Sequence, residues 1–188
     1  MKILGISGSP VKGGNNEKAI DYALTRAKSQ GFETEKITLA EKEIKSCTAC
    51  DQCKEKKGTC SINDYMETIR PKLVEADAII ISSPVYFGTL SGQLKCMFDR
   101  TLPLRRDSFK LKDKIGAAIA IGRSRNGGQE YTIQTIHIWM HIQGMLVVGD
   151  NNHFGGTIVA PFEEDVVGKK TIDDTVDKVC ELLKKIKK

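Results

Sequence analysis

The sequence contains no run of eighteen apolar residues, which is about the length that a membrane-spanning helix needs, so we expect no transmembrane segment. Residues 1–6 lead into a glycine-rich turn and not into a signal-peptide cleavage site, which predicts a cytoplasmic protein. Aromatic residues make up only 6% of the chain, and the lysines behind the net charge of +5 are scattered. Without a basic patch interleaved with aromatics, nucleic-acid binding is not expected. Four of the lysines are interpreted as the solvated face and frayed end of a final helix: Lys184, Lys185, Lys187 and Lys188.

Several familiar motifs are also missing. No internal repeat or low-complexity segment occurs, and neither the complete Walker motif, GxxxxGK followed by Ser or Thr, nor GxGxxG is present. His137 and His141 stand four residues apart, but the glutamate of the HExxH metal-binding pattern is absent between them. We interpret these two histidines as packing or interface residues, and we assign no role to His153.

The remaining pattern predicts one α/β domain covering residues 1–188. A chain of 188 residues with 40% hydrophobic content can form one substantial core. Short apolar runs alternate with amphipathic stretches, which indicates right-handed βαβ crossovers and a doubly wound, five-stranded parallel sheet. The predicted strands are 2–6, 33–39, 78–82, 115–121 and 145–148. The predicted helices are 17–30, capped by Asn15 or Asn16, 65–74, capped by Asp64, 92–100, 130–143 and 172–186.

Ligands of such sheets bind at the carboxyl ends of the strands, which directs attention to three loops. The loop at 7–16 leaves a strand and enters a helix, so its amides and hydroxyls could bind a phosphate, although a flexible turn would look the same. The loop at 83–91 offers amides beside two aromatics, which suits a planar heterocycle unless those aromatics are core residues. The loop at 122–130 brings glycines and cations to the same edge and is a weak signal alone.

Together these segments resemble the NADPH-dependent FMN reductase family of the flavodoxin-like superfamily. The matching stretches are SGSPVKGGNNEKA at 7–19, SSPVYFGTLSGQLKCMFDR at 82–100, and GGQE through GMLVVG at 127–149. The resemblance implies a flavodoxin-like sheet with strand order 2-1-3-4-5 and bound FMN. It implies a phosphate site at Ser7, Ser9, Lys12, Asn15 and Asn16, where Asn16 replaces the commoner small hydroxyl residue. It places the flavin ring along Pro84, Val85, Tyr86, Phe87 and Gly88. From the third loop we add Arg123, Gly127 and Gly128 as candidates.

Four of the six cysteines fall within fourteen residues, in a segment at about 40–63 that follows the second predicted strand and shows no periodicity. Without a secretory signal, this clustering favours a metal or redox role over disulfides. The candidates are an iron–sulfur cluster, a structural zinc ion and reduced or redox-sensing thiols. The spacing CxxCxxC, six residues and a fourth cysteine resembles the archaeal-type iron–sulfur flavoprotein subfamily. That resemblance implies a 4Fe-4S cluster on Cys47, Cys50, Cys53 and Cys60. Cys96 and Cys180 are expected to be buried apolar residues.

The resemblance implies an oxidoreductase in which a ferredoxin-type donor supplies electrons through the cluster and FMN to oxygen, hydrogen peroxide or quinones. The chemistry belongs to the cofactors, so we assign no catalytic side chain. Two alternatives are an NAD(P)H-dependent FMN or quinone reductase without a cluster, and a non-enzymatic electron carrier. The resemblance also implies a homo-oligomer, a tetramer or a dimer, for which Trp139 and Met140 are candidate interface residues if they are not part of the core.

Overall fold

The computed structural model describes residues 1–186, so Lys187 and Lys188 of the predicted lysine-rich face lie outside the described residues. The strands are β1 (Lys2–Ser7), β2 (Glu33–Thr38), β3 (Ala78–Pro84), β4 (Ile115–Gly122), β5 (Leu146–Val148) and β6 (Gly156–Val159). The helices are α1 (Asn15–Ser29), α2 (Gln52–Glu55), α3 (Met66–Glu75), α4 (Gly92–Asp99), α5 (Leu102–Arg106), α6 (Gln129–Ile142) and α7 (Val166–Ile186). No helix within the described residues is long and apolar enough to cross a membrane.

The sheet is parallel with the order β2-β1-β3-β4-β5, which confirms the flavodoxin-like prediction. Its fifth position is divided between two strands. β5 pairs with residues 115–117 of β4, and β6 pairs with residues 119–122 farther along the same strand. The chain therefore leaves the sheet at residues 149–155 and returns to it, so the single fifth strand expected at 145–148 is the first half of a split one.

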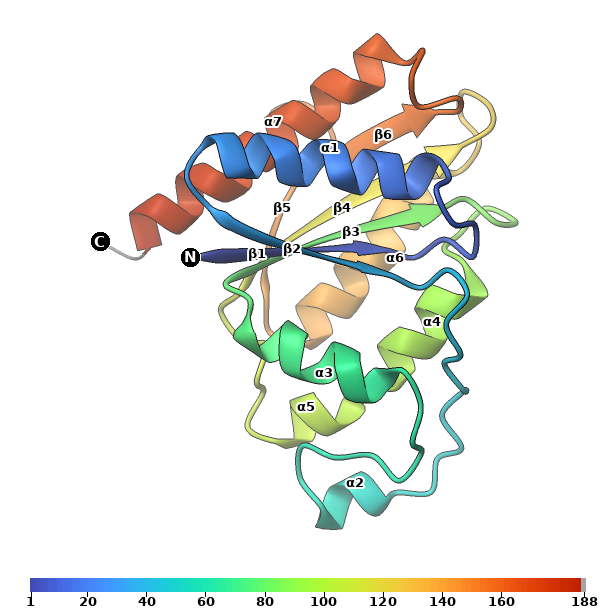
Figure 1. Ribbon diagram of the computed structural model, residues 1–188, viewed down its shortest axis with the longest axis vertical. Helices are drawn as coiled ribbons and strands as arrows, with labels where there is room; N and C mark the ends of the chain where they lie inside the picture. The colour runs from blue at the N-terminus through green and yellow to red at the C-terminus, as the bar shows by residue number, and fades with distance from the viewer. Residues whose placement is uncertain (187–188) are drawn as a thin grey trace.

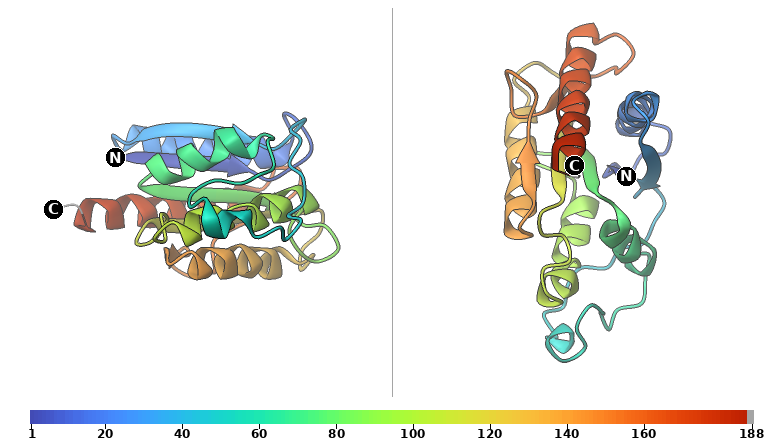
Figure 2. Two further views of the ribbon diagram at one scale, coloured as in Figure 1. Left: turned by 90° about the horizontal axis from the view of Figure 1, so that it is seen from below. Right: turned by 90° about the vertical axis from the view of Figure 1, so that its left-hand side faces the viewer.

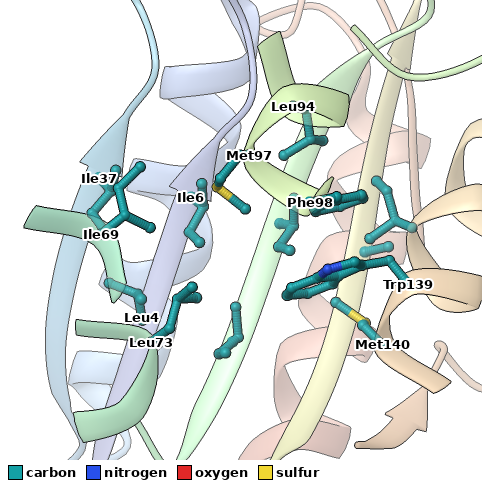
Figure 3. Close-up of a cluster of buried hydrophobic side chains, with 14 of the residues drawn as sticks. Leu4, Ile6, Ile37, Ile69, Leu73, Leu94, Met97, Phe98, Trp139 and Met140 are labelled. Carbon is teal, nitrogen blue, oxygen red and sulfur yellow. The ribbon is translucent and has the colours of Figure 1, made fainter. Parts of the chain in front are cut away.

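Helices cover both faces of the sheet, as Figures 1 and 2 show. On one face α1 and α7 pack over a core that includes Ile20 and Val176. On the other face α3, α4 and α6 enclose a second core, in which the Phe98 and Trp139 rings stack with centroids 4.3 Å apart (Figure 3). Trp139 and Met140 belong to this core, so they give no support to an oligomer interface.

The cap predicted for α1 is wrong. Gly14 occupies the N-cap position, and both asparagines lie inside the first turn of the helix. Near the start of α3, Asp64 accepts a hydrogen bond from Met66 N at 3.1 Å, although the N-cap position itself belongs to Tyr65. α7 begins six residues before the predicted start, at Val166.

Candidate functional site

Three loops meet at the carboxyl edge of the sheet, on the right in Figure 1: the first loop (7–16), the second loop (83–91) and the third loop (122–130). Backbone hydrogen bonds join the strands they leave. Gly8 N donates to Ser82 O at 2.8 Å, and Val85 N donates to Ile121 O at 2.9 Å. The Ser82 hydroxyl also donates to Asn16 O at 3.1 Å. The structure thus brings together the three segments that the sequence marked as a binding site.

The first loop contains buried polar atoms without protein partners. Ser7 Oγ and the side-chain oxygen of Asn16 are buried, and neither has a hydrogen-bond partner among residues 1–186. Ser9 is also buried, and its hydroxyl accepts a hydrogen bond from Val11 N at 3.1 Å. Since buried polar groups are nearly always paired, the loop fits a polar ligand that these side chains would contact.

Two other candidates in the first loop already have protein partners. Lys12 is exposed and forms an ion pair with Glu41 at 3.0 Å. The side-chain oxygen of Asn15 accepts a hydrogen bond from Phe162 N at 3.0 Å. Asn15 therefore connects α1 to the segment after β6, and both residues are weaker candidates than Ser7, Ser9 and Asn16.

Glu17 is a residue of this loop region that the sequence did not single out. Its carboxylate accepts hydrogen bonds from Gly13 N at 3.1 Å and from the Thr38 hydroxyl at 2.5 Å. A carboxylate near a helix N-terminus interacts favourably with the helix dipole, and here it occupies one of the amides available to an anion. An acidic residue is common in the first turn of a helix, so the sequence indicates that Glu17 lies there. The spacing of residues along the chain does not predict its hydrogen bonds to Gly13 and Thr38.

The second loop forms a tight turn at its tip. Tyr86 N donates to Thr89 O at 2.8 Å, and Thr89 N donates to Tyr86 O at 3.1 Å. Phe87 and Gly88 between them both have positive φ, 47° and 82°, and the Phe87 side chain is completely exposed at 109% of its reference area. A bulky residue in this region is uncommon and indicates a locally strained turn. Pro84 is buried at the base of the loop, while Val85 is half-buried.

The third loop makes a close approach to the second. A Cβ on Gly128 would lie 3.0 Å from both Gly88 Cα and Val85 Cγ1, and Gly128 has a φ of 106°. Both facts require glycine at this position. Gly127 is half-buried beside it, and Arg123 is exposed at the edge of the loop.

The cysteine loop (residues 40–63) lies on the same side of the sheet as α3 and α4, extends beyond these helices at the bottom of Figure 1, and carries α2 at its tip. All four of its cysteines line one pocket, together with the base of α4 and α5. The lining residues include Cys47, Cys50, Cys53, Cys60, Arg100, Leu102, Pro103 and Arg106. Within residues 1–186, no three His, Cys, Asp or Glu side chains converge where a single ion would bind. A cubane holds its thiolates on separate iron corners, so four cysteines around one pocket fit such a cluster.

One guanidinium binds the cysteine loop on either side of its four cysteines. Arg100 Nη1 donates to Lys45 O at 2.8 Å, and Nη2 donates to Ile62 O at 2.9 Å. Both nitrogens also contact the carboxylate of Asp64, at 2.7 and 3.1 Å. Each side chain of this ion pair is only 1% exposed. The pair therefore fixes the loop to the end of α4, the helix that follows the second loop.

Known proteins can now be compared with this arrangement. Residues 1–157 match the family model described as NADPH-dependent FMN reductase. An iron-sulfur flavoprotein of Methanosarcina thermophila is 53% identical over 188 residues, covering 100% of this chain and 98% of the relative. An iron-sulfur flavoprotein of Methanocaldococcus jannaschii is 49% identical, with 100% of both chains covered. The chain belongs to the NADPH-dependent FMN reductase family.

Within that family it falls in the iron–sulfur flavoprotein subfamily, and it is a flavin-dependent oxidoreductase. The fold agrees. The crystal structure of a WrbA-like flavodoxin from Agrobacterium tumefaciens superposes with a TM-score of 0.72, at 18% identity and 98% coverage of this chain and 97% of that one. At that identity the likeness concerns the fold alone.

The two cysteines outside the motif of this flavin-dependent oxidoreductase differ from each other. Cys180 is buried as expected, and burial raises the pKa of its thiol to about 11. The expectation for Cys96 is wrong. Cys96 is only half-buried, because it lies on the side of α4 that faces the cysteine loop, where its sulfur is 3.5 Å from the Ser46 hydroxyl.

The packing interpretation of the histidines agrees with the structure for one of them. His137 is half-buried on α6, and its Nε2 is buried without a partner among the described residues. Burial, with a smaller contribution from the nearby His141, lowers the pKa of His137 to about 4. His137 is therefore neutral at pH 7. His141 is exposed.

The Asp64 and Arg100 pair gives a first prediction. Burial alone would raise the pKa of Asp64, but hydrogen bonds from Arg100, Lys45 N and Met66 N outweigh it and lower the pKa. A carboxyl whose pKa is lower in the folded state stabilises the protein above its unfolded pKa of about 3.9. That stability is lost as the pH falls through the lower, folded-state pKa.

We expect Asp64→Asn to reduce the free energy of unfolding by about 3–5 kcal/mol at pH 7, because it leaves a buried guanidinium without its counter-charge. The difference from wild type should shrink as the pH falls below about 4. Denaturant unfolding at several pH values measures both effects. Asp99→Asn, which removes an exposed pair with Lys95, is the control and should cost under about 1 kcal/mol. Equal effects of the two substitutions would contradict the prediction.

Proposed function

We propose that the protein binds FMN and a 4Fe-4S cluster and passes electrons from a ferredoxin-type donor to oxygen, hydrogen peroxide or a quinone. The observation that carries this proposal is the pocket lined by all four motif cysteines, fixed through Arg100 to the helix that follows the second loop. A cluster of this kind supplies single-electron transfer, and FMN supplies both single-electron and paired transfer.

For FMN, the first loop would hold the phosphate. The unpartnered polar atoms of Ser7 and Asn16 support this assignment, as does the buried hydroxyl of Ser9. Lys12 and Asn15 would contribute only after leaving their present partners. The amides at the N-terminus of α1 add a favourable dipole for a dianion.

The flavin ring would lie against the second and third loops. The exposed aromatic rings of Tyr86 and Phe87 and the amide of Gly88 support that placement, over the buried Pro84 and the half-buried Val85. From the third loop, Gly127 and Gly128 allow the backbone to approach closely, and Arg123 supplies a positive charge at the rim. These residues bind and orient the ring and limit its contact with water.

The decisive experiment is purification without oxygen, followed by a visible spectrum and measurement of iron, sulfide, zinc and flavin. We expect about four iron and four sulfide per FMN, as a cubane requires. Stopped-flow reduction with reduced ferredoxin should be faster than with NADPH. Stoichiometric zinc, or full activity without any metal, would contradict the proposal.

A second candidate function has one observation in its favour. The family that the chain matches over residues 1–157 is described as NADPH-dependent, so direct hydride transfer from NAD(P)H to FMN is the alternative. In that case the cysteines would hold no cluster. Faster flavin reduction by NADPH than by ferredoxin would select it.

We also propose that the chain forms one domain and works in the cytoplasm.

The protein is further proposed to assemble as a tetramer or dimer. Exposed apolar residues along one side of α6 support assembly: Tyr131, Ile138 and Ile142. Light scattering across the micromolar range measures it, and a monomer at every concentration would contradict it.

A further inference from the structure

Two arginines outside the cysteine motif line the pocket of the cysteine loop. Arg106 lies at the end of α5, and its Nη1 donates to the sulfur of Cys53 at 2.8 Å. Its Nη2 donates to Asp51 Oδ1 at 3.1 Å. One guanidinium therefore bridges a motif cysteine and the residue that precedes α2, where the backbone turns with a φ of 59°.

Arg100 approaches the opposite side of the same pocket. It forms a buried ion pair with Asp64, and Cys60 lines the same pocket. Its Nη atoms donate to the carbonyls of Lys45 and Ile62 on either side of the four cysteines, and its Nε is buried without a partner among the described residues. Cys53 and Cys60 are the two half-buried members of the motif, and Arg106 contacts the sulfur of Cys53 directly.

We propose that Arg106 is a positioning residue that holds Cys53 for the cluster and raises its reduction potential, and that Arg100 positions the loop that carries Cys60. This inference rests on the proposed function. A cluster with four thiolate ligands is anionic, and accepting an electron adds negative charge, so a guanidinium that donates directly to a ligand sulfur favours the reduced form. Hydrogen bonds to the ligand sulfurs act in the same direction, and those from a charged donor are the stronger kind.

The location of the two arginines also connects the two sites. The second loop leads directly into α4, Arg100 follows the last residue of α4, and α5 ends at Arg106. A single stretch of 15 residues, from Gly92 to Arg106, therefore runs from the loop proposed for the flavin ring to both guanidinium contacts. It would set where the cluster lies relative to the flavin.

The test compares Arg106→Gln with Arg105→Gln. Arg105 is the neighbouring residue of the same helix and carries the same charge, but it lies over the Phe109 ring and does not line the pocket. Anaerobically prepared proteins are titrated with a redox mediator, and the reduced cluster is followed by electron paramagnetic resonance. The rate of iron release to a chelator and the FMN content are measured on the same samples.

In Arg106→Gln we expect the ratio of reduced to oxidised cluster, at a fixed solution potential, to fall about tenfold. This change corresponds to a reduction potential about 59 mV lower for a one-electron couple. Iron release should be about tenfold faster, and FMN content should not change. Arg106→Lys should recover part of the potential, because it keeps the charge and loses only the planar fork. A merely structural role would not move the potential in this graded way.

Arg100 is tested by Arg100→Lys, which keeps a buried positive charge beside Asp64. It should release iron faster than the Arg105→Gln control. The inference would be overturned if Arg106→Gln and Arg105→Gln had the same cluster reduction potential and the same rate of iron release. That result would leave the proposed function intact. A wild-type protein without iron and sulfide would overturn both, and that result appears before any variant is made.

Discussion

Ser9→Glu should abolish FMN binding while the fold is retained. The Ser9 hydroxyl is buried in the first loop, between β1 and α1, where we place the phosphate dianion. Two unit charges roughly 4 Å apart repel by about 4 kcal/mol at an effective dielectric constant of about 20. That repulsion corresponds to about a thousandfold weaker affinity. Quenching of flavin fluorescence on titration of the apoprotein measures the change.

Two further substitutions separate charge from packing. Asn16→Asp alters the shape of a buried side chain very little but adds a negative charge, so it should also weaken FMN binding severely. Ser29→Glu makes the same change as Ser9→Glu at an exposed position at the far end of α1, and it should bind FMN as wild type does. Unchanged affinity in Ser9→Glu and Asn16→Asp would remove the phosphate site from the first loop.

The second large effect concerns the cysteine loop. Replacing any one motif cysteine by alanine should remove most of the iron and sulfide, because a cubane needs a ligand at every iron corner. FMN should stay bound, since the three loops at the carboxyl edge contain none of these residues. Electron transfer from a one-electron donor should fall, while any direct hydride transfer from NAD(P)H should persist. The four variants are Cys47→Ala, Cys50→Ala, Cys53→Ala and Cys60→Ala.

The remaining cysteines supply matched controls. Cys180→Ala changes a thiol buried in the core between α1 and α7. Cys96→Ala is the more demanding control, because its sulfur lies 3.5 Å from a hydroxyl of the cysteine loop. Both should keep the cluster. Loss of iron from Cys96→Ala comparable to that in the motif variants would mean that the four-residue ligand set is wrong.

The sheet was predictable because its central strands carry an unambiguous pattern. β3 and β4 are buried along their whole length, and continuous apolar sequence at that length is typical of a parallel strand covered on both faces. The alternation of such runs with helices then leads to the observed order. The same topology located the three loops at the carboxyl ends of the strands, and the resemblance to a known family added the cofactor and the residues expected to bind it.

Short elements escaped prediction for a physical reason. β6 has four residues and α5 has five, too few to show a period, and both are stabilised by neighbours distant in sequence. The start of α7 was misplaced because Val166 and Val167 are exposed there, so apolar residues do not mark its buried face. The N-cap of α1 was misassigned because two asparagines follow a glycine that takes the extended conformation itself.

The candidate site was predictable as a set of loops but not as a set of contacts. Arg100 meets Lys45 across 55 positions of sequence, and Arg106 meets Cys53 across 53. A contact between residues so far apart in the sequence cannot be predicted from a local sequence pattern. Arg100 ends the segment at 82–100 that resembles the family, which was the one available signal for it.

The buried pair of Arg100 and Asp64 allows the length of the cysteine loop to vary without a change in its attachment to the fold. The carbonyls of Lys45 and Ile62, on either side of the four cysteines, bind the same guanidinium. The base of the segment between them therefore does not depend on how many residues that segment contains. Doubling the length of a flexible loop costs only about 0.6 kcal/mol in closure entropy. A longer or shorter segment between Lys45 and Ile62 would therefore leave the sheet, both helical layers and the carboxyl-edge loops in place.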